Sequence, residues 1–314
     1  MGNTVSSIFT QSLPPKPAFS VDDIPDLAGK VVIVTGSNTG IGKETVKASA
    51  LLAHNAKVYM AARSAEKAKA AIEDLRVQTG KEALFLKLDL ADLKSVKAAA
   101  VEFQEKEKEL HILFNNGGVM QSPVDQLTAD GYDLQMGTNV LGHFYFTKLL
   151  LPTLTSTARA SPEKHVRVLT TSSVMHYIGG LNFNTFKDGP ARRKLSTVAL
   201  YSQSKYGDLV FALELARRYG DQGVVSMAIN PGNIVSDLQR HLSWLKSRVS
   251  HCFLYPTPYG ALTQLWAGTT KEGAEFNGKY LVPWARIGTP RPDAEDPVLG
   301  KQLWEWLEEQ VENI

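Results

Sequence analysis

Apolar and polar residues alternate along this chain in two periods, one typical of strands and one typical of helices. Short, wholly apolar and β-branched runs such as 31–34 are typical of parallel strands that are buried on both faces. Between these runs, apolar residues recur at helical spacing. Strands are predicted at 31–34, 57–62, 84–88, 112–114, 166–170, 225–229 and 279–282.

The helical stretches are bounded by residues that commonly begin and end helices. Ser64 and Asp92 are suited to N-terminal caps, Gly80 follows a last turn, and Pro152 is expected to end a long helix. Helices are predicted at 40–54, 64–79, 92–108, 131–151, 199–218 and 260–268, with a terminal helix that carries Leu303, Leu307 and Val311 on one face.

The regular alternation of strands and helices predicts an α/β protein. We expect a single-domain, Rossmann-type, doubly wound parallel sheet with helices on both faces, covering residues 29–314. Residues 1–28 are predicted to form an N-terminal tail, in which Pro14-Pro15-Lys16-Pro17 favours extended over helical geometry. No internal repeat or linker divides the chain further.

Residues 234–256 form a candidate substrate lid. Apolar residues recur there at helical spacing with basic residues between them. The pattern fits an amphipathic lid over an apolar pocket and equally fits a helix packed on the core. The apolar positions are Leu238, Leu242, Leu245 and Val249.

Composition and charge exclude several classes of function. The 314 residues are 43% hydrophobic and carry a net charge of +2, which is typical of a soluble globular protein and gives no basic field for nucleic acid. A single cysteine, Cys252, excludes an intrachain disulfide, and no Asn-x-Ser/Thr sequon occurs, so a reducing, cytoplasmic compartment is favoured. The histidines lack metal-ligand spacing, and no metal site is expected.

Membrane association would depend on two local features. No apolar run approaches the ~20 residues that span a bilayer. Gly2 followed by Ser6 matches the N-myristoylation pattern, although a disordered tail is the favoured explanation of these residues. We therefore expect peripheral membrane binding only through N-terminal acylation or through the lid.

A glycine-rich loop joins the first strand to the first helix and predicts dinucleotide binding. Glycines in this context permit a tight turn and close approach of a pyrophosphate, and the helix N-terminus offers free N–H groups to an anion. The candidate binding residues of this loop are Gly36, Ser37, Asn38, Thr39, Gly40, Ile41 and Gly42.

The end of the second predicted strand favours one cofactor over another. NAD sites tend to place Asp or Glu there, where it bonds the ribose hydroxyls. This chain has Ala61-Ala62-Arg63-Ser64 instead, so no carboxylate repels a 2′-phosphate, and Arg63 could pair with one. The alternative is that Arg63 is a solvated surface charge. NADP(H) is therefore predicted, and NAD(H) is less favoured.

Tyr201 and Lys205 lie four residues apart on one predicted helix and therefore share a face. A phenol with a pKa near 10 exchanges protons poorly at neutral pH unless a cation stabilises its anion. Downstream of a nucleotide-binding loop, this pair predicts a redox enzyme in which the tyrosine donates or accepts the proton. A core aromatic beside a solvated lysine is the simpler alternative.

These motifs together resemble the short-chain dehydrogenase/reductase family, especially its retinol-dehydrogenase-like members and their fungal relatives. The resemblance covers most of residues 28–290. It implies catalytic roles for four residues and cofactor contacts for a further set beyond the loop. The catalytic residues are Asn139, which would hold the proton-relay water, Ser173, Tyr201 and Lys205. The further cofactor contacts are Arg63, Asp89, Leu90, Asn116, Gly117, Tyr201, Lys205, Pro231, Gly232, Ile234 and Ser236.

The chain departs from the family pattern at three places. Gly117 replaces the family's Ala, and Ser236 stands where Thr is usual. The gap of 28 residues between Ser173 and Tyr201 is about twice that of simple members, so an insertion borders the site. The choice between Ser172 and Ser173 as the active serine stays open.

The predicted function is hydride transfer between NADP(H) and a lipophilic alcohol or carbonyl substrate. Apolar lid positions, with Met120, Tyr177 and Trp244 nearby, favour a lipophilic substrate, and His176 is expected at the lip of the pocket. The alternative is a dinucleotide-sensing regulatory protein without turnover. A homo-oligomer through the helices flanking the central strands is expected from the resemblance, unless the extended C-terminus changes it.

Overall fold

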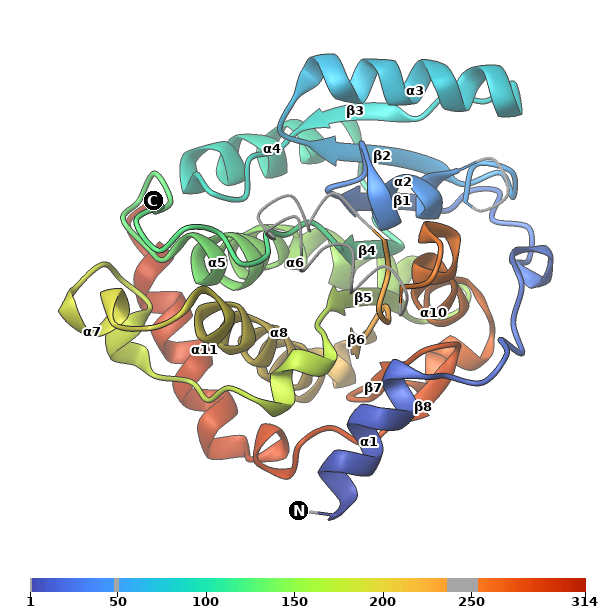
Figure 1. The fold of residues 1–314 in the computed structure, drawn as a ribbon. Helices are drawn as coiled ribbons and strands as arrows, with labels where there is room; N and C mark the ends of the chain where they lie inside the picture. Colours follow the sequence, from blue (N-terminus) through green and yellow to red (C-terminus); the bar gives the residue numbers. More distant parts are fainter. Residues whose placement is uncertain (1, 48–50, 236–253) are drawn as a thin grey trace.

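A sheet of eight strands forms the centre of the molecule, in the order β3-β2-β1-β4-β5-β6-β7-β8 (Figure 1). The structure is a computed structural model and describes residues 2–47, 51–235 and 254–314. β7 and β8 pair antiparallel, and the other neighbouring strands pair parallel. The strands are β1 (Val31–Thr35), β2 (Lys57–Ala62), β3 (Leu84–Lys87), β4 (Ile112–Asn115), β5 (Val166–Thr171), β6 (Val224–Ile229), β7 (Tyr280–Val282) and β8 (Arg286–Gly288).

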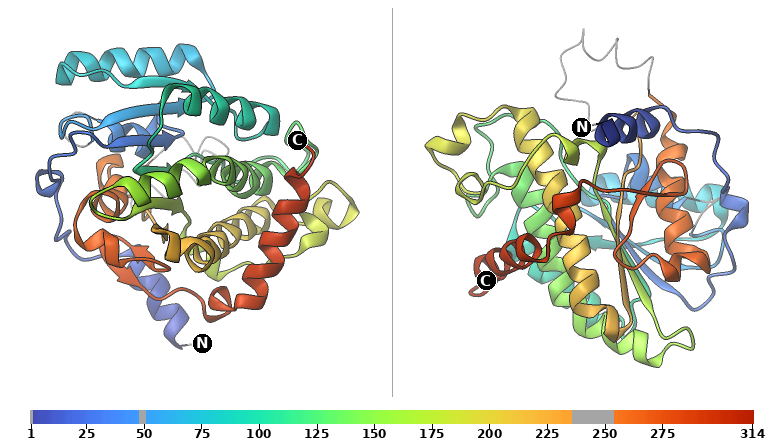
Figure 2. Two further views of the ribbon diagram at one scale, coloured as in Figure 1. Left: turned by 180° about the vertical axis from the view of Figure 1, so that it is seen from behind. Right: turned by 90° about the horizontal axis from the view of Figure 1, so that it is seen from below.

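Helices cover both faces of this sheet, and each face has its own apolar core. Figure 2 shows α8 and α10 on opposite sides of the strands. One core includes residues of α4, α6, α8 and α11, and the other includes residues of α2, α3 and α10. The longer helices are α2 (Gly40–Val46), α3 (Ala65–Thr79), α4 (Leu93–Lys106), α6 (Gly142–Ala160), α8 (Thr197–Tyr219), α10 (Thr257–Thr269) and α11 (Pro297–Val311). The predicted Rossmann-type α/β fold is confirmed.

The strand register brings the candidate motifs to one edge of the sheet. β5 pairs with β6 from Val166–Val224 to Thr171–Ile229, so residues 172–173 and 230–232 leave the sheet side by side. β1 pairs with β4 through Val34 and Phe114, which places the glycine loop beside residues 116–118. The carboxyl ends of parallel strands are where open α/β sheets bind ligands.

An N-terminal helix, α1 (Gly2–Ser12), lies within the segment that the sequence predicted to be a tail. Its sequence is rich in Ser, Thr and β-branched residues, which have modest helix propensity, so nothing local predicted it. Tertiary contacts stabilise it instead. Gln11 is buried, and its side-chain oxygen accepts hydrogen bonds from Asn230 Nδ2 and the Tyr280 hydroxyl, each at 2.8 Å.

Pro152 lies inside α6 and does not end a helix, contrary to the sequence prediction. The predicted helix 131–151 is instead divided into α5 (Leu134–Met136), a π-helical turn η2 (Gly137–Leu141) and α6. An interior proline costs a helix about 3 kcal/mol. Leu154 and Ala158 beyond it are buried in the core, and burial of this length of helix outweighs that cost.

Other differences concern element ends and short pieces. α2 ends at Val46 rather than near residue 54, because residues 51–55 form turns. β8 was not predicted, nor was the short helix α7 (Pro190–Arg193). Ser64 and Asp92 cap α3 and α4 as predicted. On α11, Leu303, Leu307 and Val311 are buried, which confirms the predicted face.

Candidate active site

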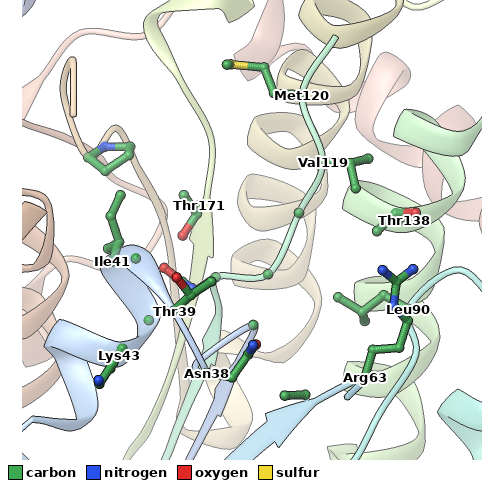
Figure 3. A pocket seen from close by; sticks show the side chains of 18 of the residues that line it. Asn38, Thr39, Ile41, Lys43, Arg63, Leu90, Val119, Met120, Thr138 and Thr171 are labelled. Carbon is green, nitrogen blue, oxygen red and sulfur yellow. The ribbon is translucent and has the colours of Figure 1, made fainter. Parts of the chain in front are cut away.

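A cavity of about 1090 Å³ lies at the carboxyl ends of the central strands. Side chains from several separate segments line it, as Figure 3 shows for Asn38, Thr39, Arg63, Val119 and Met120. The predicted site residues that line it are Gly36, Asn38, Thr39, Gly40, Ile41, Gly42, Arg63, Asp89, Leu90, Asn116, Gly117, Ser173, Tyr201, Lys205, Pro231, Gly232 and Ile234. The fold therefore brings together residues spread over some two thirds of the chain.

The glycine loop is packed too tightly for side chains at two positions. A Cβ on Gly36 would lie 2.5 Å from the Gly117 Cα, and Gly36 also has a φ of +64°. A Cβ on Gly42 would lie 2.6 Å from the Gly36 carbonyl oxygen. Ser37, predicted to contact cofactor, is buried instead, and its hydroxyl donates to the Val34 carbonyl at 2.7 Å. It shapes the loop from beneath.

Thr35 and His143 brace this loop, and sequence reasoning did not identify either. The Thr35 hydroxyl accepts hydrogen bonds from the N–H groups of Asn116 and Gly117, at 2.9 and 2.8 Å. His143 Nε2 lies 2.8 Å from the same hydroxyl oxygen. Burial lowers the pKa of His143 to about 3, so the imidazole is neutral. The only sequence signal was a threonine before the first glycine.

The end of β2 presents cations to the cavity. Arg63 is exposed there and, within the described part of the chain, makes no ion pair. Lys67, one turn into α3, also lines the cavity, whereas Lys43 is paired with Asp74 at 2.5 Å. Asp89, on the neighbouring strand end, accepts a hydrogen bond from Ala91 N–H at 3.0 Å. The geometry leaves Arg63 available to an anionic ligand.

Tyr201 and the two adjacent serines lie at the centre of the cavity wall. The side chain of Ser173 hydrogen-bonds Tyr201, whereas the Ser172 hydroxyl donates to the Lys205 carbonyl at 2.7 Å. Burial raises the pKa of Tyr201, while the Lys205 charge and the Ser173 hydrogen bond act in the opposite direction. Ser172 is thus occupied in fixing α8, and Ser173 is the serine that faces the phenol.

Lys205 is held by two acceptors. Its ammonium donates to the Thr171 carbonyl and to Asp208 Oδ2, each at 2.8 Å, and lies 5.9 Å from the centre of the Tyr201 ring. Burial lowers its pKa, but Asp208 and Tyr201 reverse this and give a net rise, so the ammonium stays charged. An ammonium has three N–H donors, and two are used, so one remains for a ligand in the cavity.

Asn139 is buried in the π-helical turn and does not line the cavity. Its side chain accepts from Val119 N–H at 2.9 Å and donates to the Val119 carbonyl at 3.0 Å and to Ser204 Oγ at 2.9 Å. Its own carbonyl lies 2.8 Å from His143 Nδ1. These contacts give it a bracing function between the segment 118–120 and α8.

The turn after β6 closes another side of the cavity. Asn230 Oδ1 accepts from Gly232 N–H at 3.0 Å, and Gly232 adopts a φ of +84° against the ring of Trp284. Ile234 bridges to Tyr255, which joins the two ends of the predicted lid. Residues 236–253 of that lid, including Ser236 and Trp244, lie outside the described residues.

Apolar side chains line the remaining wall, and the sequence expectation for His176 in this region was wrong. The apolar lining includes Val119, Met120, Leu134, Val174, Met175 and Leu254. Tyr177 does not line the cavity, because its hydroxyl donates to the Thr289 carbonyl beneath α1. His176 is not at the lip but fully buried, with its Nδ1 2.7 Å from the Ser173 carbonyl, and burial lowers its pKa to about 4.

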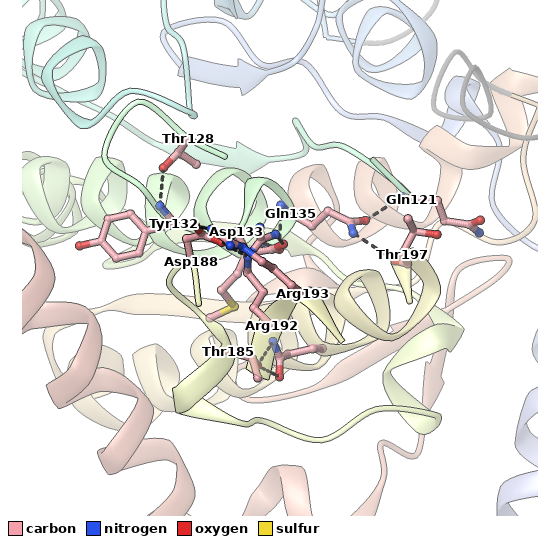
Figure 4. A network of polar contacts seen from close by, with 12 residues as sticks. Gln121, Thr128, Tyr132, Asp133, Gln135, Thr185, Asp188, Arg192, Arg193 and Thr197 are labelled. Atoms are coloured by element: carbon pink, nitrogen blue, oxygen red, sulfur yellow. Dashed lines mark hydrogen bonds and ion pairs between the residues drawn. The ribbon is translucent and has the colours of Figure 1, made fainter. Parts of the chain in front are cut away.

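The insertion before Tyr201 is folded against α5 by a buried ion pair (Figure 4). Arg192 is 1% exposed and bonds Asp133 at 3.1 Å and Asp188 at 2.9 Å. Next to Asp133, Gln135 accepts from Gln121 N–H at 2.7 Å, and Gln121 lines the cavity. Val174 and Met175 at the start of the insertion line the cavity, whereas residues 176–200 do not, and this part is connected to the site through α5.

Comparison with known proteins agrees with this geometry. The family model described as short chain dehydrogenase matches residues 30–187. A short-chain dehydrogenase/reductase of Armillaria gallica is 60% identical over 313 residues, covering all of both chains. The chain belongs to the short-chain dehydrogenase/reductase family. The resemblance stated from the sequence motifs is thereby confirmed, and the protein is an NAD(P)-dependent oxidoreductase of this family.

Three less similar proteins match the chain over most of their length. Human retinol dehydrogenase 12 is 40% identical over 281 residues, covering 88% of this chain and 85% of that protein. An uncharacterised protein of Mycobacterium paratuberculosis has a similar structure, with a TM-score of 0.73 and 29% identity over 94% of this chain and 97% of that one. The Pseudomonas aeruginosa RhlG/NADP complex gives a TM-score of 0.64 with 25% identity over 82% and 95%.

The cavity fits a dinucleotide by its chemistry. Gly36 and Gly42, where a side chain would clash, line one part of the cavity. The Arg63 guanidinium also lines it, as does the charged Lys205 ammonium, which has one N–H left for a ligand. In the described ranges, no cluster of three or more His, Cys, Asp or Glu residues could hold a metal ion. None of the helices that the structure describes combines the length and the apolar character that crossing a bilayer requires.

Proposed function

We propose that this short-chain dehydrogenase/reductase transfers a hydride between NADP(H) and a lipophilic alcohol or carbonyl compound, with Tyr201 as the proton donor or acceptor. The observation that carries this proposal is the contact of Tyr201 with Ser173 and Lys205 in the wall of the cavity. The nicotinamide cofactor, when bound, supplies or takes up the hydride. The chain's own residues hold the substrate oxygen and move its proton.

Ser173 and Tyr201 would hold the substrate oxygen with two hydroxyl groups. Reduction of a carbonyl develops negative charge on that oxygen, and preorganised hydrogen-bond donors stabilise such charge. Tyr201 gives its proton in this direction, and its phenolate accepts one when an alcohol is oxidised. Lys205 supports the phenolate by its charge, because an opposite charge within a few ångströms favours the ionised form.

Support for NADP(H) comes from Arg63. The guanidinium lies at the strand end where a 2′-phosphate would need a cation, and it has no ion-pair partner in the described residues. No carboxylate occupies residues 61–64. Asn139 fits a positioning role, because its side chain braces Val119 and Ser204 on either side of the site.

A lipophilic substrate is supported by the apolar wall. Val119, Met120 and Leu134 line the cavity on one side, and Val174 and Met175 line it beside Ser173. Apolar walls with a few convergent polar groups are typical of sites that bind small organic ligands. The polar groups beside this wall are the hydroxyls of Ser173 and Tyr201, which would bind the substrate oxygen.

The test follows the loss of NADPH absorbance with a panel of apolar ketones and aldehydes. It compares the wild-type enzyme with Tyr201→Phe. We expect the substitution to lower kcat by about 100- to 10,000-fold, since general acid catalysis contributes about 10²–10⁴-fold. Removal of one hydroxyl from a tyrosine should leave cofactor binding nearly intact. Tyr145→Phe serves as the matched control, because Tyr145 is a buried tyrosine of α6 that does not line the cavity and whose hydroxyl donates to the Ile314 carbonyl at 3.4 Å.

Two results would contradict the proposal. Turnover that survives Tyr201→Phe would exclude this tyrosine as the proton donor. Binding of NADPH without turnover on a broad panel would instead favour a dinucleotide-sensing protein on the same fold. The fluorescence of bound NADPH measures the affinity for the cofactor independently of turnover.

A further inference from the structure

Asp208 is a buried carboxyl group that the family mechanism described above does not use. It lies on α8 at the seventh position after Tyr201, so Tyr201, Lys205 and Asp208 share one helix face. Its side chain is 2% exposed, and its Oδ2 accepts from the Lys205 ammonium at 2.8 Å. Its other oxygen, Oδ1, is buried and has no hydrogen-bond partner among the described residues.

Stability alone does not explain this arrangement. Buried ion pairs gain little net stability, because removing both charges from water costs about as much as their attraction returns. A buried carboxylate oxygen without a partner adds a further cost. Among the described residues, the cation that acts on Asp208 is Lys205, the residue that lies beside Tyr201. The placement therefore points to the chemistry of the site.

We propose that Asp208 is a positioning residue that fixes the Lys205 ammonium and sets the pH at which Tyr201 exchanges its proton. The carboxylate partly cancels the lysine charge, so Tyr201 experiences a weaker positive field than a lone lysine would provide. The proton of the phenol is then held more firmly, which suits a donor in carbonyl reduction. This inference rests on the proposed role of Tyr201.

The other groups facing this trio are few. On α8 the titratable neighbours of Lys205 are Tyr201 and Asp208, and on α6 the neighbour is His143, which is neutral because burial lowers its pKa to about 3. In the described part of the chain, the Ser173 hydroxyl and the Thr171 carbonyl also contact this trio, and neither group is charged. Asp208 itself has a pKa raised to about 6 by burial, a shift that Lys205 opposes. Near and above neutral pH, Asp208 is therefore ionised and supplies the negative charge beside Lys205.

The test compares wild type with Asp208→Asn, which keeps the shape and an acceptor oxygen but removes the charge. The formation of tyrosinate is followed by ultraviolet absorbance across pH in the presence of NADP⁺, and a Tyr201→Phe partner of each protein is subtracted to isolate Tyr201. We expect the Tyr201 midpoint to fall by about one pH unit, since a nearby charge shifts a pKa by about 1–3 units. The pH profile of alcohol oxidation should move in the same direction.

Two further variants keep the result interpretable. Asp208→Glu retains the charge and should restore the wild-type midpoint even where kcat falls. Glu214→Gln removes another buried carboxylate on α8, paired with Arg217 and Arg218, and should lower stability without moving the midpoint. Thermal unfolding and NADP⁺ binding establish that each variant is folded.

The failures of the two proposals are distinguishable. A midpoint in Asp208→Asn that stays unchanged or rises would overturn the role of Asp208, while loss of turnover in Tyr201→Phe would still support the catalytic tyrosine. Turnover that survives Tyr201→Phe would overturn the proposed function itself. The tyrosinate titration needs no substrate and so gives a decisive answer in either case.

Discussion

At the scale of single residues, Arg63 carries the cofactor preference. Its guanidinium borders the cavity without an ion-pair partner in the part of the chain that is described. We expect Arg63→Gln to lower kcat/KM with NADPH by about 10- to 100-fold, since hydrogen bonds to charged groups contribute about 1.5–3 kcal/mol. The value with NADH should change by less than about threefold, because NADH lacks the phosphate that the guanidinium would bind. Steady-state kinetics with both cofactors measure the ratio.

A matched control for Arg63 lies on the neighbouring helix. Lys69 is exposed on α3 and does not line the cavity, so Lys69→Gln changes the net charge equally without touching the site. If both variants lose NADPH activity to the same extent, the effect is long-range electrostatics and Arg63 has no specific role. An unchanged cofactor ratio in Arg63→Gln would likewise argue against the assignment.

How much of the site could be read from the sequence depended on where each residue's partners lie. Gly36, Arg63 and Tyr201 were predictable, because their meaning comes from local spacing and from their position at a strand end or on a helix face. Thr35 and His143 were not, because their partners lie on other strands and helices. Asp208 was within reach, since it follows Lys205 by three residues, but only burial shows that it is the lysine's partner.

At the scale of elements, strongly periodic segments were predicted well and tertiary contacts decided the rest. β2 has the predicted bounds, and α8 extends only slightly beyond them. The continuation of α6 beyond Pro152 was not predicted, because the sequence shows the cost of an interior proline but not the buried contacts that outweigh it. α1 was missed for the opposite reason. Its stabilising contacts are made with residues more than 160 positions away.

Gln11 anchors α1 to the sheet beside the site, and its removal should affect both. Gln11 bonds Asn230, which in turn accepts from Gly232 N–H in the cavity wall. We expect Gln11→Ala to lower the free energy of unfolding by about 1–3 kcal/mol, because it leaves buried polar groups unpaired. It should also raise the KM for NADPH several-fold. Chemical denaturation and steady-state kinetics measure the two effects.

The neighbouring Thr10 provides the control for this prediction. Its side chain is exposed and, among the described residues, bonds within α1 to the Ser7 carbonyl, so Thr10→Ala should leave both quantities near their wild-type values. Wild-type stability and KM in Gln11→Ala would mean that α1 is not coupled to the site. A stability loss without a change in KM would limit the function of Gln11 to holding the helix.

At the scale of the whole molecule, the C-terminal helix covers the face of α8. Every residue of α8 from 200 to 216 is buried. Trp304 of α11 lies edge-on to Phe144 of α6, with ring centres 5.1 Å apart, and Arg218 of α8 lies 4.7 Å from its ring. Figure 1 shows α11 next to α8, and the two helices are in contact. The chain's own helix α11 thus covers the face of α8, where the family resemblance predicted contact with a second subunit.

We therefore expect the protein to be monomeric, because association through α8 would require displacement of α11 and its aromatic contacts. Light scattering over a range of protein concentrations measures the mass. Trp304→Ala removes a side chain that is 2% exposed and should cost about 3–5 kcal/mol of stability. By loosening α11 it should also promote concentration-dependent association. Val298→Ala, at a 60% exposed position of the same helix, should do neither. A stable wild-type dimer that Trp304→Ala leaves unaffected would show that a different surface mediates assembly and that α11 does not control it.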